Sequence, residues 1–401
     1  MTGALRAGAR IPASAALIAL ALVAFGGCSL QRELLQGAEE ELTEGPFYAL
    51  PTPMPAGEPG DLVRSEPLPS APDGVEAWRV LYHSTDLGGN DILVSGVVAA
   101  PDGAAPDGGR TVVSWGHPTT GTTERCAPSV GIDPFDLIEG MGGLIDRGYV
   151  VAATDYSGMG APGPDSFLVG ATEGRNVLDI VRAARQLEVG ASERAAFWGH
   201  SQGGHAALFA AQQAADYAPE LDVRAVAVAA PAVDLGKLLD ADIGDISGVS
   251  IASYAFSTYS SVYASTPGID LDSILTPAAV EAVPHMAELC LLGQNTELHD
   301  LGQPLIGGFL SADPASTEPW ASVLAENTPG GTRLEMPLYV AQGETDTLVR
   351  PELTAAFVEQ QRSLGTDVTS EVLADTGHGL VALRALTTML PWLEKAAPAQ
   401  E

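Results

Sequence analysis

The stretch Trp198-Gly199-His200-Ser201-Gln202-Gly203-Gly204 is the strongest structural signal in this chain. It contains G-x-S-x-G, follows a short apolar run and precedes an alanine-rich helical pattern. This order of strand, sharp turn and helix is typical of a nucleophile elbow, in which a strained turn leaves a serine hydroxyl accessible. We therefore predict that Ser201 is a nucleophile.

The glycines two positions to either side are needed because side chains there would collide with the neighbouring strand and helix. The N-terminus of the following helix would direct free N–H groups at developing negative charge.

The composition indicates a large globular protein with an acidic surface. The chain has 401 residues, of which 46% are hydrophobic, so it can bury a sizeable core. It carries 51 acidic and 19 basic residues, a formal net charge of −32. Because nucleic acids are bound by basic surfaces, this balance excludes nucleic acid as an expected partner. We interpret the acidity as a solvated, soluble surface.

The N-terminal segment has the pattern of an export signal. Arg6 and Arg10 precede an apolar run over residues 11–25, and small residues then lead to Cys28. This arrangement is similar to a bacterial lipoprotein signal, so we predict a signal peptide over residues 1–28 and membrane anchoring through a lipidated Cys28. Plain secretion is the alternative. Residues 29–75 are rich in Pro, Gly and Glu, and we expect an irregular tether or arm there.

The cysteine count is consistent with export. If processing consumes Cys28, only Cys126 and Cys290 remain. Exported proteins occupy oxidising compartments, where two such cysteines favour a disulfide. Two buried free thiols are the alternative.

Alternating apolar runs and helical patterns predict the fold class. Strands are expected over residues 76–84, 92–100, 111–115, 149–154, 195–199, 224–229, 338–342 and 368–373. Helices are expected over residues 134–147, 171–188, 202–217, 351–364 and 380–395. The first two strands flank a turn cluster at residues 86–90, which indicates an antiparallel hairpin. Strand–helix alternation with short connections predicts an α/β fold with a mostly parallel central sheet flanked by helices.

One region interrupts this alternation. Residues 232–333 separate the strand at 224–229 from the strand at 338–342 and contain a helical pattern over 277–292. We predict that this segment is an inserted, mainly helical cap or lid over the carboxyl edge of the sheet. The core would then consist of residues 76–231 and 334–396.

A serine nucleophile needs a base, and His378 is the best candidate. It lies in Asp375-Thr376-Gly377-His378-Gly379, between the strand at 368–373 and the last helix. Its place in the chain gives the order Ser…Asp…His that this elbow requires. His200 and His205 are expected to be structural. His285 and His299 belong to the predicted cap, where substrate contact is the alternative to a structural role.

Asp346 is the candidate for the acid that orients the base. The strand at 338–342 ends, the chain turns at Gly343, and Asp346 follows at the carboxyl edge of the sheet. Glu344 is the rival. Asp375 lies close to His378 in sequence and can instead shape its loop, and Asp155 precedes the serine, against the expected order.

Two backbone N–H groups should form an oxyanion hole. The first is expected from Gln202, which follows the nucleophile, and the second from the loop at residues 116–121. Pro118 has no N–H, so the second donor is His117, Thr119 or Thr120. We favour Thr119. An ordinary polar loop is the alternative for this segment.

The sequence does not indicate a metal or cofactor site. Residues 158–163 match G-x-G-x-x-G, but Pro162 and Pro164 prevent a helix from starting there, so dinucleotide binding is not expected. No H-E-x-x-H, Walker loop or paired C-x-x-C occurs, and we predict no metal and no cofactor.

Four motifs together resemble a known family. They are Trp115-Gly116-His117-Pro118-Thr119-Thr120-Gly121, Cys126-Ala127-Pro128-Ser129, Asp155-Tyr156-Ser157-Gly158-Met159-Gly160 and Gly199-His200-Ser201-Gln202-Gly203. They look like the secretory lipase family of α/β-hydrolases over residues 78–393. The resemblance implies the α/β-hydrolase fold, lipase or carboxylesterase activity, and Ser201, Asp346 and His378 as catalytic triad. It also implies a cap after the strand that follows the elbow helix, and a bridge from Cys126 into that cap, which fits Cys290.

These observations predict an exported serine hydrolase of carboxylic esters, acting on a small-molecule ester or lipid without a protein partner. Two alternatives stay open. One is a serine peptidase or amidase on the same fold. The other is a non-catalytic binding or envelope protein, against which a complete triad in the expected order argues.

Overall fold

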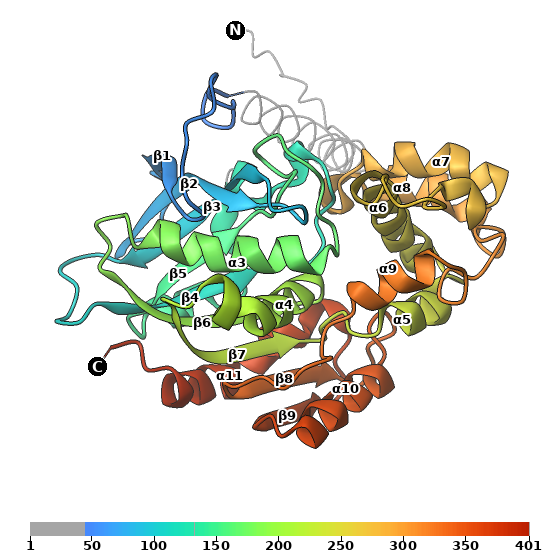
Figure 1. Cartoon of the computed structure of the whole chain (residues 1–401). Helices are drawn as coiled ribbons and strands as arrows, with labels where there is room; N and C mark the ends of the chain where they lie inside the picture. The colour runs from blue at the N-terminus through green and yellow to red at the C-terminus, as the bar shows by residue number, and fades with distance from the viewer. Residues whose placement is uncertain (1–44, 132, 401) are drawn as a thin grey trace, which may run out of the picture.

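A computed structural model describes residues 45–131 and 133–400, which are built around one nine-stranded sheet (Figure 1). The predicted signal peptide, the lipidation of Cys28 and the first part of the tether lie outside the described residues. The strands are β1 Leu62–Pro67, β2 Val75–Thr85, β3 Asp91–Pro101, β4 Arg110–Gly116, β5 Val150–Thr154, β6 Ala191–His200, β7 Asp222–Ala229, β8 Leu338–Gly343 and β9 Val368–Leu373. Their order across the sheet is β1-β2-β3-β5-β4-β6-β7-β8-β9.

The sheet is mostly parallel, as predicted. Strands β5, β4, β6, β7, β8 and β9 run parallel to one another, whereas β1, β2 and β3 form antiparallel pairs at one edge. The predicted hairpin is confirmed, because β2 pairs with β3 in a register that ends at Thr85 and Asp91.

Helices cover both faces of the sheet (Figure 1). The core helices are α2 Met141–Ile145, α3 Gly170–Ala184, α4 Gln202–Tyr217, α10 Pro351–Leu364 and α11 Val381–Ala396. Apolar residues of α3, α4 and α10 share one hydrophobic cluster with one face of the sheet, and those of α2 and α11 share a second cluster with the other face. Short 3₁₀ turns are η1 Glu124–Cys126, η2 Pro128–Val130, η3 Pro134–Leu137, η4 Leu271–Ser273, η5 Gln303–Leu305 and η6 His378–Leu380.

Two local predictions outside residues 232–333 are wrong. Part of the segment expected to be irregular, 29–75, forms β1, which pairs with β2 across a register shift between Leu62 and Arg64. This short, half-buried edge strand lacks a clear alternating pattern, so its sequence resembles a loop. The helix expected over 134–147 is interrupted, because Gly140 adopts a φ of +96° between η3 and α2. A Cβ at Gly140 would lie 2.6 Å from the side chain of Leu386.

A third hydrophobic cluster lies in the segment between β7 and β8. We call its helices the insertion helices: α5 Leu235–Asp242, α6 Ile246–Val262, α7 Pro277–Ala287, α8 Leu291–Gly302 and α9 Trp320–Glu326. Figure 1 shows them gathered on one side of the sheet. The helix expected over 277–292 is in fact two, because Cys290 is extended and separates α7 from α8. Phe167 and Leu168, from the loop before α3, pack into the same cluster.

The insertion helices are fastened to the loop after β4. Cys126 and Cys290 form a disulfide. Close to it, the Thr122 hydroxyl donates to the Ala287 carbonyl at 2.9 Å, and the Leu291 N–H donates to the Thr120 carbonyl at 2.8 Å. The loop predicted to supply an oxyanion donor is therefore held against α7 and α8.

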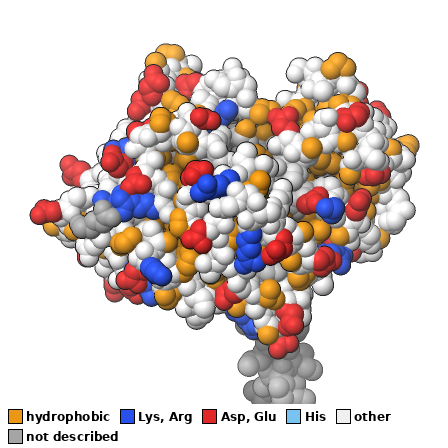
Figure 2. Space-filling view, turned by 60° about the horizontal axis from the view of Figure 1, so that its bottom comes forward, with side chains coloured by type: hydrophobic (Ala, Val, Ile, Leu, Met, Phe, Trp, Pro, Cys, Tyr) orange, Lys and Arg blue, Asp and Glu red, His pale blue; other side chains and the backbone are white. Residues whose placement is uncertain are grey.

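Charged side chains of both signs are interspersed on the molecular face in Figure 2 rather than gathered by sign. Among the described residues, no helix has both the length and the apolar character needed to cross a bilayer.

We expect the disulfide to contribute measurably to stability. Its two cysteines are 164 residues apart, and reduction releases a long constrained loop in the unfolded chain. The double variant Cys126→Ser/Cys290→Ser should lose about 2–5 kcal/mol of unfolding free energy in urea titrations. The unfolding free energy of the wild-type protein should fall by a similar amount in a reductant. Unchanged urea midpoints in both experiments would contradict the expectation.

A second stability prediction concerns pH. The hydroxyl of Thr258 in α6 donates to the carboxyl group of Asp165, in the loop before α3. Burial raises the pKa of Asp165 from its usual 3.8 to about 6. Between these values the native state keeps a proton on Asp165 that the unfolded chain has lost, so the contribution of this group to stability falls as pH rises from about 4 to about 6.

Asp165→Asn removes this titration. Between pH 4 and pH 6, the variant should therefore lose roughly 1–3 kcal/mol less unfolding free energy than wild type. The exposed Asp102→Asn variant is the matched control and should follow wild type. Parallel pH profiles for wild type and Asp165→Asn would refute the prediction.

Candidate active site

Ser201 lies at a strained turn between β6 and α4. Its backbone has φ 57° and ψ −118°, a region that residues other than glycine rarely adopt. The flanking glycines permit this turn, as predicted: a Cβ on Gly199 would lie 2.1 Å from the Gly203 carbonyl oxygen. A Cβ on Gly203 would lie 1.8 Å from the Gly116 carbonyl oxygen of β4. The three backbones therefore touch, and any side chain there would force them apart.

The structure brings Ser201, His378 and Asp346 together. His378 Nε2 lies 2.9 Å from Ser201 Oγ, although 177 residues separate the two in the chain. On its other side, His378 Nδ1 donates to Asp346 Oδ2 at 2.8 Å. Because a carboxylate only accepts, Nδ1 carries the proton and Nε2 is left free to accept from the serine hydroxyl. Ser201 is 8% exposed, so the group is accessible but largely screened from water.

Asp346 is held in the charged state. Its Oδ1 accepts hydrogen bonds from the N–H groups of Leu348 and Val349, both at 2.9 Å. Burial raises the pKa of this carboxyl group, but the hydrogen bonds from His378 and the two amides outweigh burial, and the pKa lies below its usual value. A charged Asp346 can therefore orient the imidazole and stabilise its protonated form.

The loops that carry Asp346 and His378 are joined to each other. The Thr345 N–H donates to the Thr376 carbonyl at 3.0 Å, and the Glu344 N–H donates to the Leu373 carbonyl at 2.9 Å. Gly343 allows this approach, because a Cβ there would lie 2.3 Å from the Thr376 carbonyl oxygen. These backbone contacts align the turn after β8 with the turn after β9.

The rival acids lie elsewhere. Glu344 is exposed, and its carboxylate accepts from the backbone N–H of Asp375 at 3.2 Å. Asp155 is buried, and its carboxyl group accepts from the hydroxyls of Ser95 and Ser129. Burial raises the pKa of Asp155. Neither acid has a hydrogen bond to His378, so the geometry favours Asp346 as the orienting acid.

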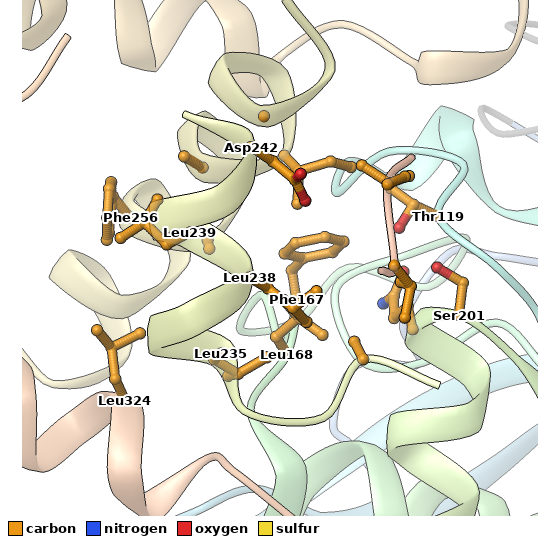
Figure 3. Close-up of a pocket in the computed structure, with 18 of the residues that line it drawn as sticks. Thr119, Phe167, Leu168, Ser201, Leu235, Leu238, Leu239, Asp242, Phe256 and Leu324 are labelled. Carbon is orange, nitrogen blue, oxygen red and sulfur yellow. The ribbon is translucent and has the colours of Figure 1, made fainter. Parts of the chain in front are cut away.

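Both predicted oxyanion residues line the cavity next to Ser201. Gln202 is the first residue of α4, where a backbone N–H has no partner within the helix. Thr119 lies at the same end of the cavity as Ser201 (Figure 3). The loop of Thr119 is anchored by the hydroxyl of Tyr156, which donates to the His117 carbonyl at 3.1 Å. The identity of the second donor stays a prediction.

The cavity extends from Ser201 between the core and the insertion helices, and its volume is about 90 Å³. Figure 3 shows the mainly apolar side chains around it. Its apolar walls are formed by Phe167, Leu168, Ala232, Leu235, Leu238, Leu239, Ile251, Ala252, Ala255, Phe256, Leu324, Leu348 and Val349. An ester with an apolar chain could therefore place its carbonyl carbon at Ser201 and its chain among these residues.

A buried polar cluster behind the elbow was not predicted. Glu173 in α3 is fully buried, and its carboxyl group accepts from Gln202 Nε2 at 2.7 Å and from the Leu168 N–H at 3.0 Å. It also lies 3.2 Å from His205 Nδ1, and His205 Nε2 donates to the Asn327 carbonyl at 2.8 Å. The cluster thus joins α3, the elbow helix and the end of the insertion helices. In the sequence, an acidic residue in the first turn of a helix is ordinary, so nothing signalled its burial.

The remaining histidines are not part of the hydrogen-bonded group of Ser201, His378 and Asp346. The His200 ring packs against the His378 ring with centroids 4.9 Å apart, and its Nδ1 lies 3.0 Å from Glu139. His285 is exposed and, like His299, does not line the cavity. Within residues 45–131 and 133–400, no group of three or more His, Cys, Asp and Glu side chains could hold a metal ion.

Comparisons with known proteins agree with this architecture. The model of a family described as "Secretory lipase" matches residues 136–396. Among solved structures, Candida antarctica lipase A in its closed state has a TM-score of 0.74 at 20% identity, covering 89% of this chain and 86% of that chain. This likeness confirms the predicted fold class.

Two curated proteins are similar over part of their length. The chain is 28% identical over 216 residues to "Probable inactive lipase MT1628" of Mycobacterium tuberculosis (strain CDC 1551 / Oshkosh), covering 48% of this chain and 46% of that protein. It is 29% identical over 201 residues to Lipase 10 of Candida albicans (strain SC5314 / ATCC MYA-2876), covering 44% and 40%. The matches therefore span less than half the length of these two relatives.

We expect the buried cluster around Glu173 to stabilise the fold. Glu173→Ala would leave the side chains of Gln202 and His205 without their buried acceptor, so the unfolding free energy should fall by about 3–5 kcal/mol. Glu193→Ala, at an exposed position in β6, is the matched control and should change it by less than about 0.5 kcal/mol. Equal unfolding midpoints for the two variants in urea would show that the cluster does not support the fold.

Proposed function

The chain belongs to the secretory lipase family, and from this premise we propose that it is a serine hydrolase that cleaves carboxylic esters through an acyl-enzyme on Ser201. The observation that carries the proposal is the continuous hydrogen-bonded series from Ser201 Oγ to His378 at 2.9 Å and from His378 to Asp346 at 2.8 Å. A hydroxyl, a base and an orienting carboxylate in this geometry are the parts that nucleophilic catalysis requires.

In the proposed mechanism, Ser201 Oγ attacks the ester carbonyl carbon while His378 Nε2 takes the hydroxyl proton. Asp346 keeps the imidazole in the required tautomer and stabilises the imidazolium. The N–H of Gln202 and a second donor, for which we favour Thr119, stabilise the oxyanion. His378 then gives its proton to the leaving alcohol. Water, activated by the same histidine, finally releases the acid from Ser201.

We propose carboxylesterase behaviour on short acyl chains rather than triacylglycerol lipase behaviour. The cavity beside Ser201 has a volume of about 90 Å³, which is small compared with the roughly 300–1,000 Å³ of ordinary ligand sites. Its apolar walls suit an alkyl chain, and its size favours a short one. The insertion helices form much of this wall, and we propose that they act as the cap of the site.

A non-catalytic role deserves comparison, because one relative is named a probable inactive lipase. The side chains present in this protein favour a catalytic role. Ser201, His378 and Asp346 are all present and within hydrogen-bonding distance in the order that catalysis needs. A protein kept only for binding would not require this geometry.

We further propose that the protein is exported and is either anchored through Cys28 or secreted. The family description and the sequence pattern before Cys28 support export. The disulfide between Cys126 and Cys290 also fits an oxidising compartment. Mass spectrometry of the mature N-terminus would distinguish an acylated cysteine from simple cleavage.

The mechanism predicts the effect of removing each group. Ser201→Ala and His378→Ala should each lower turnover of a short p-nitrophenyl ester by about 10⁴–10⁶-fold, because both act as one unit. Asp346→Asn should cost less, about 10²–10⁴-fold, since the base remains. Ser363→Ala, at an exposed position in α10, is the matched control and should retain full activity.

Two further measurements separate the candidate functions. A fluorophosphonate probe should label wild type and Ser363→Ala but not Ser201→Ala; labelling that survives Ser201→Ala would remove Ser201 as nucleophile. In a series of p-nitrophenyl esters from acetate to palmitate, we expect the highest kcat/KM at short chains. A maximum at palmitate would favour a lipase, and preference for aminoacyl anilides would favour a peptidase.

A further inference from the structure

The cavity beside Ser201 contains one charged side chain, which the proposed mechanism does not use. Among the described residues that line it, only Asp242 carries a charge. Thr119 and Ser201 lie together at the reacting end, and the hydroxyl of Tyr259, which also lines the cavity, donates to the Leu168 carbonyl. Figure 3 shows Asp242 apart from Thr119 and Ser201, with its carboxyl group directed into the cavity. A carboxyl group in an apolar cavity needs a physical reason, because burying it without partners is costly.

Contacts within the described part of the protein satisfy only one of the two oxygens of the Asp242 carboxyl group. Asp242 is the last residue of α5, and its side chain is 7% exposed. Arg350 Nη2 donates to Asp242 Oδ1 at 3.2 Å and also to the Ala241 carbonyl at 2.8 Å. Among the described residues, Asp242 Oδ2 has no hydrogen-bond partner. One oxygen is therefore held by Arg350, and the other is available to a molecule in the cavity.

The residues that line the cavity also indicate which part of an ester the cavity would hold. His378 gives its proton to the leaving alcohol, so the alcohol must lie on the side of the imidazole. His378 does not line the cavity, whereas Ser201 and the predicted oxyanion residues do. The cavity is therefore the place of the acyl chain, which stays bonded to Ser201 after the alcohol has left.

The surroundings of Asp242 favour a neutral ligand group over a cation. Burial raises the pKa of Asp242 to about 6, with Arg350 opposing this and the negative charges of Asp245 and Asp346 adding to it. The group is thus close to the point at which it changes charge. A hydroxyl can pair with either form of the carboxyl group, as donor or as acceptor. An ammonium group would lose its hydration in apolar walls and would keep a strong pairing only with the charged form.

We propose that Asp242 is a specificity-determining residue that binds a hydroxyl group on the acyl chain, so that the preferred substrates are esters of short hydroxy acids. This inference rests on the proposed ester hydrolysis by Ser201 and extends it to the class of acyl group. An unsubstituted chain leaves Asp242 Oδ2 unpartnered in the occupied cavity. A chain with a hydroxyl at the matching position supplies the missing hydrogen bond.

The test compares methyl esters of 3-hydroxybutanoate, 6-hydroxyhexanoate and 8-hydroxyoctanoate with the unsubstituted esters of the same length, by acid release at constant pH. For wild type, we expect kcat/KM to be about 10–100-fold higher for at least one hydroxy ester than for its partner, the range of a hydrogen bond to a charged group. Less than a threefold preference at every length would overturn the proposal. So would a stronger preference for 6-aminohexanoate, or for a hydroxyl placed on the alcohol part.

Variants at position 242 test whether Asp242 causes the preference for hydroxy esters. Asp242→Leu keeps a similar size without polar atoms, and its hydroxy preference should fall below about threefold while the unsubstituted ester is still cleaved. Asp242→Asn, a smaller change, should reduce the preference and keeps the test available if the leucine variant does not fold. Asp240→Asn, an exposed carboxylate in the same helix, is the matched control and should keep the wild-type preference.

The outcomes separate this inference from the function on which it rests. A hydroxy preference that survives Asp242→Leu would overturn the role of Asp242 but leave ester hydrolysis intact. Absence of hydrolysis of all esters, together with absence of fluorophosphonate labelling, would overturn the proposed function itself. Because the readout is a ratio between two substrates of one protein preparation, a partly unfolded variant does not imitate the expected result.

Discussion

The candidate site depends on a close backbone contact between two strands and the helix that follows Ser201. Gly199 of β6 and Gly203 of α4 approach each other and Gly116 of β4 so closely that a Cβ would not fit. This contact holds Ser201 at φ 57°, and the hydrogen bond from its N–H to the Ala229 carbonyl at 3.0 Å fixes it to β7. A conformation of this kind costs of order 1–3 kcal/mol and persists only where the surrounding structure enforces it.

The parallel sheet then determines where the other groups meet. Strands β6, β8 and β9 run in the same direction, so the chain leaves all three at one edge, and Ser201, Asp346 and His378 follow there. The insertion helices lie beside Ser201 at this edge and provide most of the apolar cavity wall. The disulfide and the Glu173 cluster attach them at two separate points, to the loop after β4 and to the elbow helix.

Local patterns were enough to predict most of the core. The helices at 202–217 and 351–364 and the strand at 368–373 were expected with the bounds that the structure has, because their apolar periodicity coincides with their burial. The edge strand β1 was missed because it lacks a clear alternating pattern. The interruption at Gly140 was missed because it depends on Leu386, a neighbour distant in sequence. The same holds for Glu173 and Asp242, whose residue types are ordinary in exposed helices and become unusual only through burial.

The amino-acid order alone therefore determined the strand–turn–helix unit around Ser201, the α/β class and the order of the three candidate catalytic residues, because these follow from short-range periodicity and turn chemistry. Tertiary packing alone decided that Asp346 rather than Glu344 contacts His378, that Glu173 supports the elbow, and that Asp242 faces the cavity. Each of these depends on which distant segments become neighbours, and pairings between distant segments leave no periodic signal along the chain.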